Sequence, residues 1–224
     1  MIRQFVVLAV AVSVALYLAN QARKPSRWLG RWIVRGMNQS HSDLTDWGLG
    51  HLNLARVATI LDVGCGGGRT VQKLAGLAPG SRVFGVDFAP GSVAASQATN
   101  AALIREGRVE IHEASVSHLP FPDATFDLVT AVETHYYWPD LPSDIREVLR
   151  VLKPGGTSIV IAEAYRDSRH GLVQTPAMAL LRGKLLSLDE HRAWFEAAGF
   201  TDVRVFEERA RDWMCVMGVR PGGA

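Results

Sequence analysis

The sequence has few cysteines and no strong excess of charge of either sign. Its 2 cysteines, Cys65 and Cys215, form neither a disulfide framework nor a metal-ligand spacing, so we expect two reduced thiols and no metal. The 24 Lys and Arg nearly balance the 22 Asp and Glu. There is also no basic track with interleaved aromatic residues. The composition is therefore unlike that of a disulfide-stapled scaffold, and we expect no nucleic-acid partner.

Long apolar runs are scarce too, and the one exception lies near the N-terminus, from residue 5 to residue 19. It is shorter than the roughly 20 residues that span a bilayer comfortably. Basic residues follow it and no good cleavage site appears, so a signal peptide is disfavoured. By the positive-inside rule, residues 1–24 are predicted to be a membrane-anchor helix with the body of the chain in the cytoplasm. A buried or dimer-forming helix, and hence a homodimer, is the alternative.

Residues 25–50 are predicted to form a second, amphipathic unit before the main domain at 51–224. Arg27, Arg31 and Arg35 recur every four residues beside Trp28 and Trp32. Such a helix can lie among lipid headgroups or can pack on the domain with its arginines solvated, and the pattern leaves both open. The polar segment 36–48 that follows is either a capped loop or part of a site.

The chain is organised around a glycine-rich stretch that follows an apolar run at 60–63. Gly64, Gly66 and Gly68 separate this expected strand from helix-forming residues at 71–75. Glycine allows positive φ in the turn and close approach of a ligand to the helix N-terminus, so the loop is predicted to bind a nucleotide. A dinucleotide fingerprint would need its third glycine at position 69, which is Arg69, and this disfavours a nicotinamide-dependent oxidoreductase.

The pattern D-x-G-x-G-x-G from Asp62 to Gly68 resembles motif I of the class I S-adenosylmethionine-dependent methyltransferases, of the type 11-like group. Asp87, at the end of the expected strand 81–87, stands where an acid accepts hydrogen bonds from ribose hydroxyls. The stretches 119–129 and 149–156 look like further landmarks of this family, in the expected order. The resemblance implies an α/β, Rossmann-like fold whose seven-stranded, mostly parallel sheet carries helices on both faces, with the hydrophobic helix in front of it.

The resemblance also implies S-adenosylmethionine as cofactor and assigns residues to its site. Ser115 occupies the place where many relatives carry an Asp for the adenine amino group, so this contact is expected to rest on Ser115 and the backbone of Val116. The residues expected to bind the cofactor are Asp62, Gly64, Cys65, Gly66, Gly68, Asp87, Phe88, Ser115, Val116 and Glu133.

The loop at 133–140 follows the expected fourth strand and is the most informative one for chemistry. Ligands bind outside the carboxyl ends of strands in such sheets, so this loop should face the reactive methyl group. The expected catalytic residues are His135 and Glu133 as bases, with Tyr136 and His41. The alternative for each is structural hydrogen bonding or packing. The expected substrate pocket comprises Asn38, His41, Trp47, Tyr136, Tyr137 and Trp138, the first three from a lid.

The predicted function is methyl transfer to a small, lipophilic acceptor through an oxygen, nitrogen or sulfur nucleophile, by a membrane-anchored enzyme with its catalytic domain in the cytoplasm. The alternative is a non-catalytic S-adenosylmethionine-binding or scaffold protein at the membrane.

Ser187 and Glu190 form a capping box for a helix through Ala198. The other predicted elements are helices at 90–104 and 142–152 and strands at 109–112, 127–132, 157–162, 203–206 and 214–219.

Overall fold

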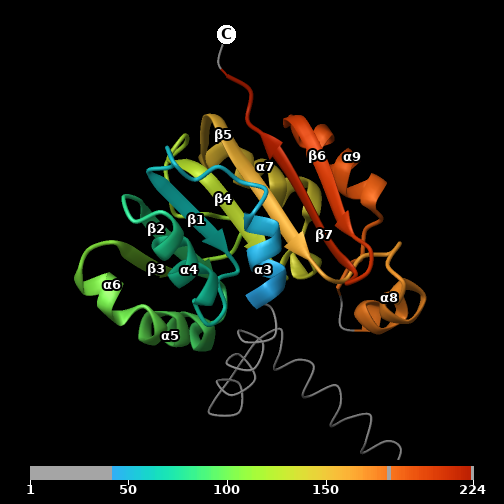
Figure 1. Ribbon diagram of the computed structural model, residues 1–224, viewed down its shortest axis with the longest axis horizontal. Helices are drawn as coiled ribbons and strands as arrows, with labels where there is room; N and C mark the ends of the chain where they lie inside the picture. Colours follow the sequence, from blue (N-terminus) through green and yellow to red (C-terminus); the bar gives the residue numbers. More distant parts are fainter. Residues whose placement is uncertain (1–41, 181–182, 223–224) are drawn as a thin grey trace, which may run out of the picture.

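The computed structural model describes residues 42–180 and 183–222, which are built around one seven-stranded sheet (Figure 1). The strand order is β3-β2-β1-β4-β5-β7-β6, and every neighbouring pair is parallel except those that β7 makes with β5 and β6. The predicted seven-stranded, mostly parallel sheet is confirmed. The strands are β1 (Thr59–Val63), β2 (Arg82–Asp87), β3 (Val109–Glu113), β4 (Phe126–Val132), β5 (Leu152–Ala162), β6 (Thr201–Glu208) and β7 (Trp213–Val219).

Helices cover both faces of the sheet, as predicted. In Figure 1, α3, α4 and α5 lie in front of the strands, whereas α7 and α9 lie behind them. The carboxyl ends of β1, β4 and β5 point to the lower edge of this view, where α8 also lies. The bounds are α3 (Ser42–Leu49), α4 (Arg69–Leu77), α5 (Pro90–Thr99), α6 (Ala101–Arg105), η1 (His135–Tyr137, a 3₁₀ turn), α7 (Leu141–Val151), α8 (Gly171–Leu180) and α9 (Leu188–Ala198).

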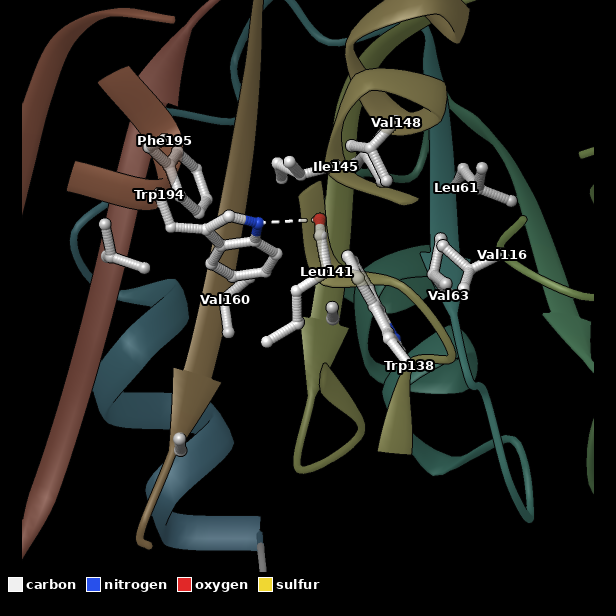
Figure 2. Close-up of a cluster of buried hydrophobic side chains, with 14 of the residues drawn as sticks. Leu61, Val63, Val116, Trp138, Leu141, Ile145, Val148, Val160, Trp194 and Phe195 are labelled. Atoms are coloured by element: carbon white, nitrogen blue, oxygen red, sulfur yellow. Dashed lines mark hydrogen bonds between the residues drawn. The ribbon is translucent and has the colours of Figure 1, made fainter. Parts of the chain in front are cut away.

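The central strands are apolar on both faces because each face has its own hydrophobic core. Along β5, Ile159 and Ile161 join the core under α3 and α4, while Val160 and Ala162 join the core under α7 and α9. Figure 2 shows part of the second core, where the indole Nε1–H of Trp194 donates to the carbonyl of Leu141 at 2.8 Å. Because successive side chains of a strand point to opposite faces of the sheet, neighbouring residues of one strand belong to different cores.

The prediction of one helix over residues 90–104 is wrong, because the chain breaks at Asn100 into α5 and α6. The Asn100 side chain donates to the carbonyls of Gly68 and Ser96, each at 3.0 Å. Asn100 is buried, and its tie to the glycine loop fixes a non-helical backbone at this position. A long-range contact thus overrides a continuous local helical pattern.

The predicted membrane-anchored localisation is corrected by the structure. Within residues 42–180 and 183–222, no helix has both the length and the apolar character needed to cross a bilayer. The predicted anchor helix at 1–24, the amphipathic segment from residue 25 and the lid residues Asn38 and His41 lie outside the described residues. From the expected lid, α3 is described, and its Leu44 and Leu49 are buried in the core.

Candidate active site

A cavity of about 190 Å³ opens at the carboxyl ends of β1, β2, β3 and β4. Parallel strands all end at this edge, so loops far apart in sequence meet there. Most of the lining side chains are apolar, and Asp87 is the one carboxylic acid among them. The lining residues are Val63, Gly64, Val86, Asp87, Phe88, Ala114, Ser115, Val116, Thr134, Tyr137, Trp138 and Pro139.

The glycine loop between β1 and α4 forms one wall of the cavity and has the strand, turn and helix that were predicted. Gly64 has a φ of 73°, and a Cβ on it would lie 2.1 Å from the Thr134 hydroxyl oxygen. Only glycine fits there, for both its backbone conformation and its contact with the loop after β4. The space around Gly66 is open, since a Cβ there would meet nothing within 4 Å.

Asp87 ties the end of β2 to this loop. Its Oδ2 accepts the N–H of Gly66 at 3.0 Å, and its Oδ1 accepts the N–H of Ala89 at 2.9 Å. Burial raises the pKa of Asp87, while these backbone hydrogen bonds act to lower it. A carboxylate oxygen accepts more than one hydrogen bond, so a buried acceptor with remaining capacity lies at the cavity wall.

Asp62 lies deeper, with a side chain that is 2% exposed. Its Oδ1 accepts a hydrogen bond of 2.6 Å from the Thr130 hydroxyl. Burial raises the pKa of Asp62 to about 7, against the opposing effect of Thr130. Cys65 is also buried, and its thiol lies 3.7 Å from the Ser96 hydroxyl with a pKa raised by burial. The Cys65 thiol therefore packs in the core beneath the loop rather than lining the cavity.

The rest of the lining is mainly apolar, and Ser115, Thr134 and Tyr137 contribute its hydroxyl groups. Phe88 is 45% exposed although it lines the cavity, an arrangement that leaves a flat aromatic face open. Ser115 Oγ accepts the N–H of Ser117 at 3.2 Å, so its own O–H remains to donate. Figure 2 shows Trp138 beside Val63 at the end of the buried cluster, and both line the cavity.

The loop after β4 contains the predicted catalytic residues, but their side chains are turned away from the cavity. His135 is fully buried, and its Nε2 lies 3.0 Å from Nε2 of His191 on α9. The Tyr136 hydroxyl donates to Glu133 Oε1 at 2.8 Å, and Glu133 Oε1 also accepts the Glu163 N–H. Burial lowers the pKa of His135 and raises that of Tyr136, so both side chains are neutral near pH 7.

The placement of several predicted site residues differs from what the sequence suggested. His135 and Tyr136 lie in the core, so the geometry does not support a proton-transfer role for His135 or a pocket role for Tyr136. Glu133 is part of a hydrogen-bonded corner between β4 and β5 and does not line the cavity. Trp47 packs against His51 and Trp213 on the α3 face of the sheet, with ring centroids 5.0 and 6.0 Å away. It too is absent from the lining.

The structure brings together Gly64, Asp87, Phe88, Ser115, Val116, Tyr137 and Trp138 from the expected set. Sequence reasoning missed Thr134 and Pro139, although both lie within the loop that it singled out. The close contact between Thr134 and Gly64 joins segments 70 residues apart and leaves no local signal. Val63 and Val86 were also missed, and these could have been found as the last apolar residues before the turns that end β1 and β2.

The side chain of Met178 on α8 reaches the same loop. The Tyr137 hydroxyl lies 3.8 Å from the Met178 sulfur, and the Lys184 N–H donates to the Tyr136 carbonyl at 2.9 Å. The sequence of α8 contains no charged residue, and its Leu172 and Val173 are 95% and 75% exposed. The segment after β5 therefore borders the cavity with an apolar helix.

Comparison with known proteins agrees with this geometry. The profile of a family described as a methyltransferase domain matches residues 61–160. This match covers less than half of the chain and marks residues 61–160 as similar to a methyltransferase domain. The chain is 31% identical over 167 residues to 27-O-demethylrifamycin SV methyltransferase of Amycolatopsis mediterranei, covering 73% of this chain and 61% of that protein. It is 36% identical over 111 residues to demethylmenaquinone methyltransferase of Symbiobacterium thermophilum, covering 49% of this chain and 44% of that protein.

A solved structure shares the fold of the methyltransferase domain. Human N-acetylserotonin methyltransferase, in complex with S-adenosylmethionine, superposes with a TM-score of 0.69 at 19% identity. The alignment covers 87% of this chain and 56% of that one. S-adenosylmethionine is the ligand bound in that structure.

The residues present fit this cofactor. The cavity is apolar enough for a planar base and includes the aromatic rings of Phe88 and Trp138 in its lining, and Asp87 supplies the acceptor that a ribose needs. The open space at Gly66 lets a ligand approach the backbone there. The methyltransferase domain would therefore hold the adenosine part with Asp87, Phe88, Ser115 and Val116.

Proposed function

We propose that this chain is an S-adenosylmethionine-dependent methyltransferase that acts on a small acceptor. The observation that carries the proposal is the position of Asp87, which is buried at the wall of an apolar cavity beside the glycine loop. A carboxylate there has capacity for hydroxyl groups, and the apolar walls suit a base. This combination serves a nucleoside cofactor better than it serves a charged or polymeric ligand.

The cofactor brings an electrophilic methyl group on a positively charged sulfur, so the protein mainly has to bind, align and exclude water. Asp87 would accept hydrogen bonds from the ribose hydroxyls, and Gly64, which has no Cβ, allows the loop after β4 to approach the glycine loop closely. Tyr137 and Trp138 shield the cavity from water. Alignment of two reactants of this kind is worth about 7–11 kcal/mol, so positioning alone supplies a large share of the rate.

The proposed acceptor is small and largely apolar, with an oxygen, nitrogen or sulfur nucleophile. Support comes from Tyr137 and Met178, whose contact joins the cavity to the uncharged helix α8. Two relatives are named as methyltransferases of 27-O-demethylrifamycin SV and of demethylmenaquinone, which are small-molecule acceptors. Because His135 is turned away from the cavity, we favour a phenol or thiol that ionises without a histidine base.

Titration calorimetry with S-adenosylhomocysteine tests the cofactor assignment directly. Asp87→Asn should weaken binding about 10-fold or more, because hydrogen bonds to a charged acceptor contribute about 1.5–3 kcal/mol. The matched control is Asp189→Asn, which removes the same charge from an exposed position on α9. Equal affinity of Asp87→Asn and the unmodified protein would contradict the assignment.

Turnover requires a second experiment, with a label on the methyl group of S-adenosylmethionine. We expect label transfer to apolar phenols or thiols in preference to charged soluble metabolites. Tight cofactor binding without transfer to any acceptor in such a panel would favour the non-catalytic binding protein instead. A preference for charged metabolites would overturn the proposed acceptor class while leaving the cofactor assignment intact.

A further inference from the structure

The turn after β4 presents different side chains to its two sides. Thr134, Tyr137, Trp138 and Pro139 line the cavity, whereas His135 and Tyr136 between them are 0% and 3% exposed and lie in the interior. The cavity-lining residues can contact a bound ligand, and the buried pair, His135 and Tyr136, determines the position of the turn. The question is what holds the interior pair in place.

The first anchor is the hydroxyl of Tyr136. It donates to Glu133 Oε1 at 2.8 Å and accepts the N–H of Ala164 at 3.1 Å, so it links the ends of β4 and β5. Glu133 Oε1 accepts the N–H of Glu163 as well, at 2.6 Å. Glu133 has a φ of 57°, and this left-handed backbone conformation is strained for a residue with a Cβ. The hydrogen bonds of the Glu133 side chain to Tyr136 and Glu163 hold the residue in this conformation.

The second anchor is a chain of two imidazoles that runs to the start of α9. The Ser187 carbonyl can only accept, so His191 donates through Nδ1, at 2.7 Å. The Nε2 of neutral His191 is then an acceptor, and His135 donates to it through its own Nε2. This leaves His135 Nδ1 unprotonated and buried, without a hydrogen-bond partner in the described part of the chain.

We propose that His135 and Tyr136 are positioning residues, which hold Thr134, Tyr137 and Trp138 against the cofactor cavity and take no part in proton transfer. The inference rests on the proposed function, because it takes this cavity as the cofactor site. Each residue reaches the cavity only through the turn, and each is fixed by a partner outside it: Tyr136 by Glu133 and Ala164, and His135 by His191.

A positioning role predicts an effect on cofactor affinity in the absence of any acceptor. Where only a fraction of molecules holds the turn in its binding geometry, the apparent dissociation constant rises in inverse proportion to that fraction. A residue that only moves a proton leaves S-adenosylhomocysteine binding unchanged. Binding of this product therefore separates the two roles without knowledge of the acceptor.

The first test is Tyr136→Phe, which removes the hydroxyl and keeps the ring. We expect S-adenosylhomocysteine to bind about fivefold more weakly and the amides of Tyr137 and Trp138 to exchange faster, because one bridging hydroxyl is lost. The matched control is Tyr165→Phe. Tyr165 is also fully buried and also donates to a glutamate, Glu207, at 2.7 Å, but that pair points to β6. Unchanged affinity and exchange in Tyr136→Phe would overturn the proposal.

The second test is a double-mutant cycle on the imidazole pair. His135→Leu and His191→Leu should each weaken S-adenosylhomocysteine binding several-fold, and the double variant should be no weaker than either, since both break one chain. His51→Leu is the control, because His51 is stacked on Phe206 in the α3 core, away from the cavity. Should His135→Leu bind normally and lose only turnover, His135 would be a base. If leucine prevents folding, His135→Gln replaces it in the cycle.

These outcomes separate the cofactor assignment from the positioning role. Failure of the unmodified protein to bind S-adenosylhomocysteine would contradict the proposed function. Normal binding by the unmodified protein together with full affinity in all turn variants would contradict the positioning role alone.

Discussion

The two halves of the cavity are constructed by different means. On the β1 and β2 side, the wall is made by backbone: the positive φ of Gly64 and the N–H groups of Gly66 and Ala89 that bind Asp87. On the β4 side, it is held by side chains from distant segments, such as His135 with His191, 56 residues apart. The glycine spacing of the first wall is encoded in a short motif, and its one longer link is the hydrogen bond from Gly66 to Asp87, 21 residues on. The second wall is held by more distant side chains and has no such motif.

The buried ionisable groups differ between the halves in the same way. Asp62, beneath the glycine loop, has a pKa raised to about 7, and His191, behind the turn, has a pKa lowered to about 4. Burial is the main cause of both shifts, and in both it disfavours the charged form. The two halves should therefore respond to pH with opposite signs.

The largest effect is expected from Gly64→Ala. The left-handed backbone and the overlap with the Thr134 side chain together should lower the free energy of unfolding by about 4 kcal/mol. Gly66→Ala meets open space and should lower it by only about 1 kcal/mol, from backbone strain. Urea denaturation measures both values.

A second substitution locates the cause of the Gly64 effect. All three atoms nearest a Cβ at Gly64 belong to the Thr134 side chain, so Thr134→Gly should recover part of the stability of Gly64→Ala. Equal losses for the two glycine variants would mean that the contact across the cavity is unimportant and that both halves are set by local backbone.

How well the sequence predicts the fold depends on how locally each element is specified. The strand before the glycine loop, the capping box at Ser187 and the strand predicted at 109–112 each have signals within a few residues, and the structure contains all three. The break at Asn100 was not predictable, because its cause is a hydrogen bond to Gly68, 32 residues away. Local patterns specify elements, and long-range polar contacts interrupt them.

The candidate site shows the same limit. The glycines and Asp87 could be predicted because a backbone cradle needs particular residues at particular spacings. Aromatic and ionisable residues at 133–138 could be predicted as a loop at the site, but not which of them face it. A turn reverses side-chain direction within one residue, and only the position of His191 and Ala164 in space decides that His135 and Tyr136 point inward.

The pH response of Asp62 should be the next largest effect. Its pKa is higher in the folded than in the unfolded chain, so the native state binds more protons between about pH 4 and pH 7, and stability falls as pH rises. Between about pH 4.5 and pH 8 the loss should be about 3 kcal/mol. Asp62→Asn should flatten this dependence and raise stability at pH 8. A variant with the same pH profile as the unmodified protein would show that Asp62 remains charged.

His191 should give a smaller response of opposite sign. Its pKa in the folded chain, about 4, lies below the unfolded value of 6.5, so the unfolded state binds more protons between these values. Stability from this group is fully present above about pH 6.5 and is lost as pH falls toward 4, by about 2 kcal/mol between pH 7 and pH 5. Urea denaturation of His191→Gln in the Asp62→Asn background isolates the effect, because it removes the opposing titration. Loss of the acid-side slope in His191→Gln would assign it to the imidazole chain behind the turn. A slope that persists in this variant would assign the acid-side response to His135, whose pKa burial also lowers, rather than to His191.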